Sequence, residues 1–366
     1  MPVFNYAGMV RSEASWAHVG RSLATAALQD GWDAAILDIE EDRYRADYSI
    51  SPSLDSRLVS AQQARLWSHT SATFLGPDSY GLLPSRSVDT SLLAYESSVW
   101  PAAWVEEFNA SDISFAVMPC EWGRTTAIES GFDADRVAVV YHGVDHDVFF
   151  PSPPKDRDHG GITFMFCGTS AYRKGLDILL DAWPSAFRPS DQVRLLIKLA
   201  PYDGVTARPY LLPDWRERVQ ALSRSGFEVD VDLEARTSPE MADLYRKCDV
   251  LVSPIRGECA PIVILEAMAC GMTVIATDYA GIAELVGGAG SLLDPGSLRQ
   301  CIGWLPACRE PDAMMAEPDV DELIEVLRRR AMSSDEAKGM RAIALARAAS
   351  FSWHAAWTSL RHLLTT

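Results

Sequence analysis

The sequence predicts an α/β protein with two doubly wound parallel sheets. Strand and helix patterns alternate along both halves of the chain, as in parallel sheets, where each strand needs a crossover before the next. Residues 151–161, rich in proline, glycine and charged side chains, separate the two series. A length of 366 residues exceeds what one core normally serves, so two domains of about 150–200 residues are expected.

The first series of elements begins at the N-terminus. Short apolar runs bounded by polar residues predict strands, and apolar residues three or four positions apart predict helices. Strands are expected over residues 3–9, 34–39, 92–96, 113–119 and 137–141. Helices are expected over residues 16–31, where a glycine ends the pattern, and over residues 54–66.

The second series follows residue 161. Strands are expected over residues 162–167, 193–199, 250–253, 274–277 and 291–293, and helices over residues 239–247, 319–330 and 334–350. Another helix follows the first of these strands, because one face carries Leu176, Leu179, Leu180, Trp183 and Phe187. In the last segment, residues 351–364, a stripe must pack on another element: Trp353, Ala356, Trp357, Leu360 and Leu364.

Composition narrows the functional classes. A formal charge of −17 argues against binding nucleic acid or an anionic membrane surface. No export signal and no membrane-spanning run are recognised, and the seven cysteines are interpreted as buried free thiols, so a cytoplasmic location is expected. The Asp-x-Asp stretches at residues 145–147 and 230–232 are not interpreted as metal sites, and no metal ligand is predicted. His69 is interpreted as a core or surface residue.

Residues 257–271 carry the most informative pattern. Glu258 and Glu266 stand eight positions apart around an apolar run, Pro261 suits a first helical position, and Gly271 suits the residue after the last turn. Loop amides and a helix N-terminus favour an anion at this place. The arrangement therefore suits a long polar ligand with phosphate near its middle and hydroxyls at both ends, such as a nucleotide-sugar.

A second loop follows the strand at residues 162–167. Gly168 permits a close approach of the backbone, and Lys174 can place an ammonium group against phosphate at the start of the next helix. Alone, an Arg-Lys pair such as Arg173 and Lys174 is more often a solvated helix cap. Because this loop precedes the Glu258 loop by about half a sheet, both are expected to face one phosphate pair.

The ordered set of motifs resembles the retaining glycosyltransferases of family 4, which have the GT-B fold of two facing Rossmann-like domains. The matching segments are Glu258-x7-Glu266 with Gly271, the R-K-G element at residues 173–175, the YHGVD stretch at residues 141–145, the region from Ala94 to Trp122, and the terminal F-S-W at residues 351–353. The resemblance implies an N-terminal domain over residues 1–152, a linker over 153–161, a donor domain over 162–350 and a returning helix over 351–366.

Roles carried over by this resemblance assign most of the expected site. Lys174 and Arg173 are expected to neutralise the donor diphosphate, Glu258 to hold the sugar hydroxyls, Glu266 to accept from the ribose, and Glu96 to approach sugar or acceptor. The other expected donor-binding residues are Gly168, Thr169, Cys259, Ala260, Pro261 and Ile262. The other acceptor-side residues are Gly8 and His142, of which His142 is thought more to fix a turn than to catalyse.

The function implied is transfer of a sugar from a UDP- or GDP-type donor to a hydroxyl of a glycan or small metabolite, with retention and without a required cofactor or metal. Two departures from the family pattern stand out. Thr169 replaces a common arginine, and Pro261 removes an amide donor after Glu258. An isomerase or hydrolase acting on the same nucleotide-sugar, and a binding protein without turnover, therefore remain alternatives. Association with a membrane is not indicated, because residues 55–65 offer only two arginines.

Overall fold

The computed structural model describes the chain except residues 13–14, 40–49, 65–70, 74–76, 78–79, 81–82, 84–87, 152–160, 201–209, 302–304, 306–307 and 333. The chain divides into two compact units. Unit 1 comprises Met1–Tyr95, Val99–Gly143 and Phe351–Thr366, and unit 2 comprises Glu96–Ser98 and Val144–Ser350. The predicted linker at residues 153–161 lies outside the described residues except for Gly161, and the predicted domain boundaries stay a prediction.

Unit 1 contains a six-stranded sheet in the order β2-β1-β3-β4-β5-β6, in which every pairing is parallel. Its strands are β1 Val3–Gly8, β2 Asp33–Asp38, β3 Ser71–Thr73, β4 Thr90–Leu92, β5 Phe115–Met118 and β6 Val137–Val139. Its helices are α1 Ser15–Gln29, α2 Pro52–Asp55, α3 Ala61–Ala64, α4 Ala102–Ala110, α5 Glu121–Glu129, the 3-10 turn η3 Ala134–Arg136, and α13 Trp353–Thr365.

The C-terminal helix α13 packs against α1 in unit 1. All members of the expected stripe are buried, which confirms that part of the prediction: Trp353, Ala356, Trp357, Leu360 and Leu364. The ring of Trp357 lies edge-on to Phe4 and its indole N–H donates to Asp30 Oδ2 at 2.9 Å. The last helix thus completes the core beside β1.

Unit 2 contains a second parallel six-stranded sheet, in the order β12-β11-β10-β7-β8-β9. Its strands are β7 Ile162–Gly168, β8 Val193–Leu199, β9 Glu228–Asp232, β10 Val250–Ser253, β11 Thr273–Thr277 and β12 Ser291–Leu293. Numbered within the unit, this is the 3-2-1-4-5-6 order of the Rossmann fold. The order of connection reverses between β7 and β10.

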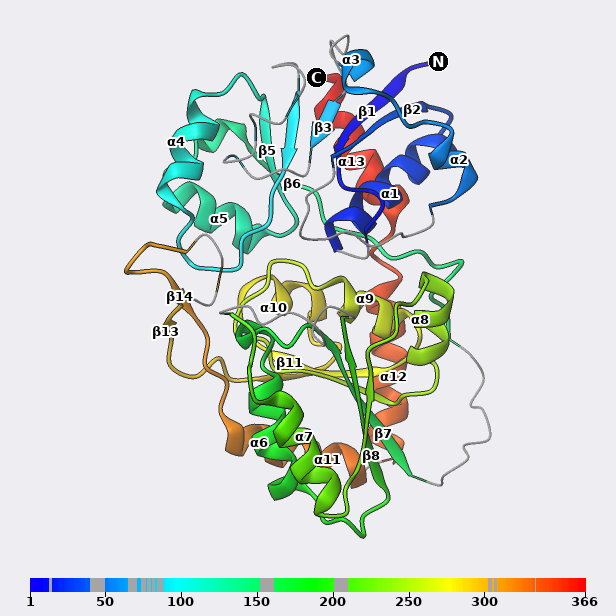
Figure 1. The fold of residues 1–366 in the computed structure, drawn as a ribbon, viewed down its shortest axis with the longest axis vertical. Coiled ribbons are helices and arrows are strands. Elements are labelled where there is room, and N and C mark those ends of the chain that lie inside the picture. Colours follow the sequence, from blue (N-terminus) through cyan, green and yellow to red (C-terminus); the bar gives the residue numbers. More distant parts are fainter. Residues whose placement is uncertain are drawn as a thin grey trace. The chain divides into compact units, whose positions relative to one another are not determined.

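Helices cover both faces of the second sheet (Figure 1), with α6, α7 and α11 grouped on one face and α8, α9 and α12 on the other. The helices of unit 2 are the 3-10 turn η4 Tyr172–Lys174, α6 Leu176–Ala186, α7 Trp215–Arg224, α8 Ser238–Tyr245, α9 Ile262–Ala269, α10 Ala280–Val286, α11 Val320–Met332 and α12 Ser334–Ala348. A short antiparallel pair, β13 Arg299–Gln300 and β14 Met314–Met315, follows the sheet in sequence.

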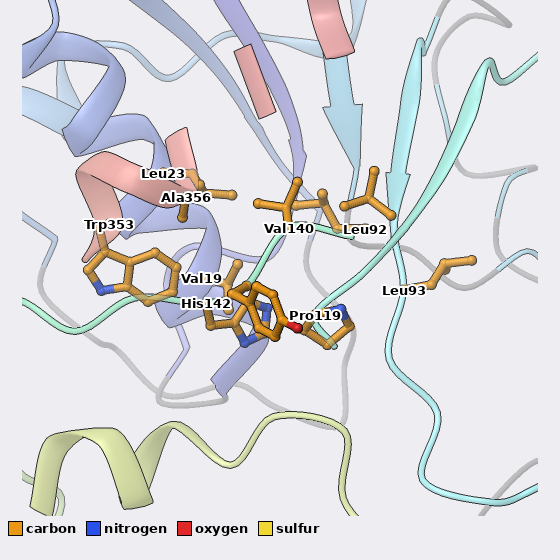
Figure 2. A pocket seen from close by; sticks show the side chains of 11 residues that line it. Val19, Leu23, Leu92, Leu93, Pro119, Val140, His142, Trp353 and Ala356 are labelled. Carbon is orange, nitrogen blue, oxygen red and sulfur yellow. The ribbon is translucent and has the colours of Figure 1, made fainter. Parts of the chain in front are cut away.

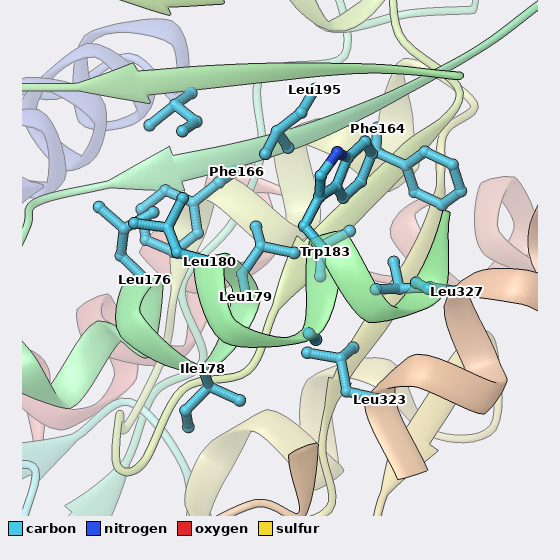
Figure 3. Close-up of a cluster of buried hydrophobic side chains, with 14 of the residues drawn as sticks. Phe164, Phe166, Leu176, Ile178, Leu179, Leu180, Trp183, Leu195, Leu323 and Leu327 are labelled. Carbon is cyan, nitrogen blue, oxygen red and sulfur yellow. The ribbon is translucent and has the colours of Figure 1, made fainter. Parts of the chain in front are cut away.

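The core of unit 2 lies between its sheet and α6 (Figure 3). Trp183 of α6 is fully buried and meets the ring of Phe164 edge-on at 5.5 Å between centroids. Leu327 of α11 packs into the same cluster. The predicted apolar face of α6 is confirmed, since its five members are all buried: Leu176, Leu179, Leu180, Trp183 and Phe187.

The predicted α/β fold class is confirmed, and three local expectations are corrected. Residues 54–66 do not form one helix, because the chain leaves the helical path between α2 and α3. The strand expected over residues 92–96 ends at Leu92, so Glu96 lies in the loop that follows. Pro261 is the N-cap of α9 rather than its first helical residue, whereas Gly271 follows the C-cap with φ +84°, as expected.

The seven cysteines are free and buried, as predicted. None of the helices in the described part of the chain combines the length and apolar character that crossing a membrane requires.

Candidate functional site

The reversal of strand order between β7 and β10 locates the candidate site. In open parallel sheets, ligands bind outside the carboxyl ends of strands where the order reverses, since the two flanking loops run apart there. β7 ends at Gly168 and the paired strand β10 ends at Ser253. The loops that follow carry the cations and carboxylate that the sequence indicated.

Four charged side chains of unit 2 meet beyond these strands, and we call them the charge cluster: Glu96, Arg173, Lys174 and Glu258. The Glu258 carboxylate accepts hydrogen bonds from the Lys174 ammonium and from the Arg173 guanidinium. A second nitrogen of Arg173 lies 3.3 Å from Glu96 Oε1. The four side chains are 13–19% exposed, so they interact with little screening by water.

The environment shifts the pKa values of the two carboxyl groups of the charge cluster in opposite directions. Burial raises the pKa of Glu96, and Arg173 offsets this only in part. Burial also opposes ionisation of Glu258, but Arg173 and Lys174 bring its pKa below the ordinary value. Burial lowers the pKa of Lys174, against the attraction of Glu258. Glu258 is therefore the more readily ionised carboxyl group of the charge cluster, and it pairs with both cations.

A left-handed glycine shapes the turn that carries the cations. Gly175 has φ +74° and separates η4 from α6. A Cβ atom added there would lie 1.9 Å from the carbonyl oxygen of Pro254, in the loop after β10. The two loops of the site therefore touch through backbone at a place where only glycine fits.

Arg256 was not singled out from the sequence, and it joins three segments around the site. Its side chain, 4% exposed, forms a bidentate pair with Asp177 at 2.8 Å for both bonds and an ion pair with Glu317 at 2.7 Å. It also donates to the carbonyl oxygen of Tyr172 at 2.6 Å. No local motif could reveal this residue, since its partners lie 79 and 61 positions away in the sequence.

The segment Glu96–Ser98 is held beside the charge cluster by contacts with residues in and next to β13 and β14. Ser98 N donates to Met314 O at 3.2 Å, and Met314 N donates to Ser98 Oγ at 2.9 Å. The Cys301 thiol lies 3.4 Å from Ser97 Oγ. Gly257 completes the fit, because a Cβ atom there would lie 2.3 Å from Glu96 O. These contacts hold Glu96 beside Arg173 within unit 2.

Glu266 lies apart from the charge cluster, on the buried side of α9. It is 9% exposed and its Oε2 accepts a hydrogen bond from the Tyr245 hydroxyl at 3.0 Å. The Tyr245 hydroxyl also lies 3.6 Å from Cys167 Sγ at the end of β7. Burial raises the pKa of Glu266 to about 7, against the hydrogen bond from Tyr245. The sequence did not indicate Tyr245 as the partner of this carboxyl group.

The loop between Glu258 and α9 is compact. Cys259 is 1% exposed, Pro261 and Ile262 are buried, and Ala260 is partly exposed. Pro261, the N-cap residue of α9, makes no side-chain capping hydrogen bond. Glu258 O accepts a hydrogen bond from Gly281 N at 3.2 Å, which ties this loop to α10. The first backbone N–H groups of a helix favour an anionic ligand, and two cations lie in the neighbouring loop.

The remaining donor-side residues lie at the end of β7. Gly168 is its last residue, and a Cβ atom there would make only ordinary contact with Lys174 at 3.8 Å. No described side chain therefore requires glycine at this position. Thr169 follows, and its hydroxyl accepts a weak hydrogen bond from Ala171 N at 3.4 Å.

The predicted acceptor-side residues are divided between the two units. Glu96 belongs to unit 2, whereas Gly8 and His142 belong to unit 1. Gly8 ends β1, where a Cβ atom would lie 2.8 Å from the Tyr6 hydroxyl, so Gly8 makes room for that ring. His142 stacks at a tilt on Trp353, with 5.9 Å between ring centroids.

His142 also lines a small pocket of unit 1, which Figure 2 shows from close by. Apolar residues from the ends of three strands, from α1 and from α13 form most of its wall, among them Val19, Leu92, Val140 and Ala356. A cavity of about 10 Å³ admits one water at most, so this pocket is not a substrate site as it stands.

Other residues discussed from the sequence take structural positions. In the stretch at residues 230–232, Asp230 pairs with Arg194 and Asp232 with Arg236. Within the described residues, no three histidine, cysteine, aspartate or glutamate side chains are grouped as metal ligands. His69 lies outside the described residues.

Comparison with known proteins agrees with this geometry. A family model described as "Glycosyl transferases group 1" matches residues 161–305. The D-inositol 3-phosphate glycosyltransferase of Frankia alni is 29% identical over 248 residues, which are 64% of this chain and 54% of that protein. The chain thus spans about half the length of this curated relative.

Two solved structures show the fold. Anabaena HepE in complex with UDP-glucose superposes with a TM-score of 0.69 at 17% identity, covering 100% of both chains. Sucrose-phosphate synthase from Thermosynechococcus elongatus gives a TM-score of 0.69 at 15% identity, covering 99% of this chain and 98% of that one. These findings confirm the predicted GT-B fold and the resemblance to group 1 glycosyltransferases.

Proposed function

We propose that this chain transfers a sugar from a nucleotide diphosphate donor of the UDP or GDP type to an acceptor hydroxyl, with retention of configuration and without a required metal. The observation that carries this proposal is the charge cluster at the strand-order reversal of unit 2. Three of its four residues, Arg173, Lys174 and Glu258, lie inside the segment that the group 1 family model matches. The glycosyltransferase activity of the Frankia relative supports the transfer of a sugar, and the UDP-glucose bound to HepE supports a donor of the UDP type.

The chemistry follows from the cations. Breaking the bond between sugar and diphosphate builds negative charge on the leaving group, and Arg173 and Lys174 stand where that charge would be stabilised. Preorganised charge of this kind contributes about 3–4 kcal/mol for each well-placed donor. Same-face attack, in which the departing phosphate takes the acceptor proton, then needs no carboxylate nucleophile and accords with retention.

Roles for the carboxylates follow from their positions. Once a diphosphate takes the two cations, the Glu258 carboxylate is free to accept hydrogen bonds from the donor sugar. Glu266 lies on α9, and its Oε2 accepts a hydrogen bond from Tyr245. Its other carboxylate oxygen is proposed to accept hydrogen bonds from the ribose hydroxyls. Glu96, whose pKa is raised by burial, is suited to hold a proton near the sugar.

The test is a turnover assay on a panel of UDP- and GDP-sugars, with candidate glycans and small polyols as acceptors and a chelator present. We expect release of the nucleoside diphosphate only when donor and acceptor are both present, and an α- or β-linkage that matches the donor. Product formed from donor alone would favour an isomerase or hydrolase. Binding of donors without any product over the whole acceptor panel would favour a binding protein.

A further inference from the structure

We propose that Arg256 is a positioning residue that fixes the turn carrying Arg173 and Lys174, and thereby sets the affinity of the site for a diphosphate. The inference rests on the proposed donor site. Arg256 belongs to none of the groups assigned above to the donor, and its buried guanidinium is fully engaged by protein.

Arg256 holds the backbone of the cation-bearing turn η4 at two successive residues. Its guanidinium Nη1 donates to Tyr172 O at 2.6 Å, and its own backbone N donates to Arg173 O at 2.7 Å. The guanidinium carbon also lies 5.2 Å from the centre of the Tyr172 ring. The two carbonyl groups that precede Lys174 are therefore oriented by one residue of the loop after β10.

Arg256 is itself held from both sides. Asp177, in the first turn of α6, accepts hydrogen bonds from Nη1 and Nη2 of Arg256. Glu317 accepts hydrogen bonds from Nη2 and Nε of Arg256. Ala316 N donates to the backbone oxygen of Arg256 at 2.9 Å. Burial disfavours the charged guanidinium, but Asp177 and Glu317 outweigh it and raise the pKa of Arg256.

Geometry distinguishes this role from simple attraction of an anion. Asp177 and Glu317 together outweigh the single positive charge of Arg256, so the residue adds no net positive field at the phosphate site. A lysine would keep the charge but lose the fork that joins Asp177, Glu317 and Tyr172 at once. Replacing Arg256 by lysine therefore loosens the placement of the two cations without removing either of them.

The experiment compares Arg256→Lys with Arg330→Lys, which changes a second buried arginine of unit 2 whose partners are Ser291 and Glu336. Calorimetry measures affinity for UDP and GDP, and ligand-detected NMR measures affinity for uridine and guanosine. We expect Arg256→Lys to weaken diphosphate binding about tenfold or more, because the charge-assisted hydrogen bonds from Arg173 and Lys174 to phosphate lose their geometry, while nucleoside binding stays within about twofold. Arg330→Lys should alter neither affinity.

Two outcomes overturn the inference alone: diphosphate binding by Arg256→Lys that equals the wild type, or equal losses of diphosphate and nucleoside binding. Either outcome is decisive when, in the same experiment, the wild type binds the diphosphate and Lys174→Ala does not. A wild type that binds neither UDP nor GDP overturns the proposed donor site, and this inference with it. Should Arg256→Lys fail to fold, Glu317→Gln gives the same contrast, because it weakens one side of the hold on Arg256 and is expected to lower diphosphate affinity about threefold.

Discussion

The Glu258 carboxylate pairs with the two cations that are proposed to bind a diphosphate. Its carboxylate bonds to Lys174 and to Arg173, and with Glu96 it balances their charge. A diphosphate adds at least two negative charges, so we propose that it displaces Glu258 from these cations when it binds. The same carboxylate is expected to hold the donor sugar afterwards. We therefore expect Glu258 to oppose binding of the nucleotide and to support turnover of the sugar.

Glu258→Gln is predicted to bind UDP or GDP about tenfold more tightly than the wild type, because it leaves the two cations without a competing carboxylate. The same change is predicted to lower turnover at least about 100-fold, because the neutral amide holds the sugar hydroxyls less well. Calorimetry and a product assay measure the two effects. Asp181→Asn serves as the control and should change neither nucleotide affinity nor turnover. Asp181 lies on α6 and forms an ion pair with Arg218 of α7 at the surface. Weaker nucleotide binding by Glu258→Gln would contradict the exchange.

Glu266 affects stability through its raised pKa. A carboxyl group whose pKa rises from its ordinary value of 4.5 to about 7 binds more protons in the folded than in the unfolded state between these values. Stability contributed by the neutral form is therefore present at pH 5 and is lost as the pH rises towards 7.

Glu266→Gln is predicted to stabilise the ligand-free protein at pH 8 by up to about 3 kcal/mol, because the amide stays neutral and still accepts from Tyr245. At pH 5 the variant and the wild type should differ by less than about 1 kcal/mol. Urea unfolding at the two pH values measures the difference. The same variant should bind the donor less tightly. Equal destabilisation at both pH values would show that the carboxyl group is held ionised.

At the scale of elements, the contact between the loops after β7 and β10 depends on Gly175. Gly175→Ala is predicted to destabilise the protein by more than the about 1–2 kcal/mol of a left-handed alanine, because the added methyl meets Pro254 O. Gly288→Ala is the matched control, since Gly288 has φ +81° with no atom near its Cβ position. Thermal unfolding and donor titration should both show Gly175→Ala as the more damaged variant. Equal effects would mean that strain alone explains the glycine.

Sequence patterns predicted elements best where apolar residues were dense. Strands β8, β10 and β12 begin and end at the expected residues, because each is a run of mostly apolar residues. Helix α7 and the edge strand β9 were not expected, since both are largely polar and partly exposed. The helix expected over residues 54–66 was wrong, because residues 56–60 between α2 and α3 are not buried and do not continue the helix.

The candidate site shows the same division. Glu258, Arg173 and Lys174 stand in recognisable local motifs, and the structure brings them together with Glu96. Arg256 and Tyr245 could not be found in that way, because each acts through partners distant in the sequence. Gly8 and His142 were expected near the acceptor, and the structure gives both of them packing contacts in unit 1. Their roles stay predictions.

At the scale of the whole molecule, the last helix returns to the first unit. Gly143 makes this return possible, because a Cβ atom there would lie 2.2 Å from the backbone of Ser352 and Trp353. Trp357 then fills the space beside Phe4 and Trp32. The stability of unit 1 therefore depends on residues that come after all of unit 2 in the chain.

Trp357→Ala is predicted to destabilise unit 1 by about 3–5 kcal/mol, through lost burial and the cavity left behind. Hydrogen exchange should rise in β1 and α1, whereas β7 and β10 keep their protection. Ser359→Ala, exposed on the same helix, should leave both regions unchanged. An equal rise of exchange in β7 and β10 would contradict a core confined to unit 1.

The central claim is that the charge cluster of unit 2 receives a nucleoside diphosphate. Its most direct test is calorimetric titration of UDP and GDP into the wild type and Lys174→Ala. The account predicts that the wild type binds at least one of the two, and that loss of the ammonium group weakens this binding at least about tenfold, or about 1.4 kcal/mol. Binding of neither nucleotide to the wild type, or equal binding to both proteins, would contradict it.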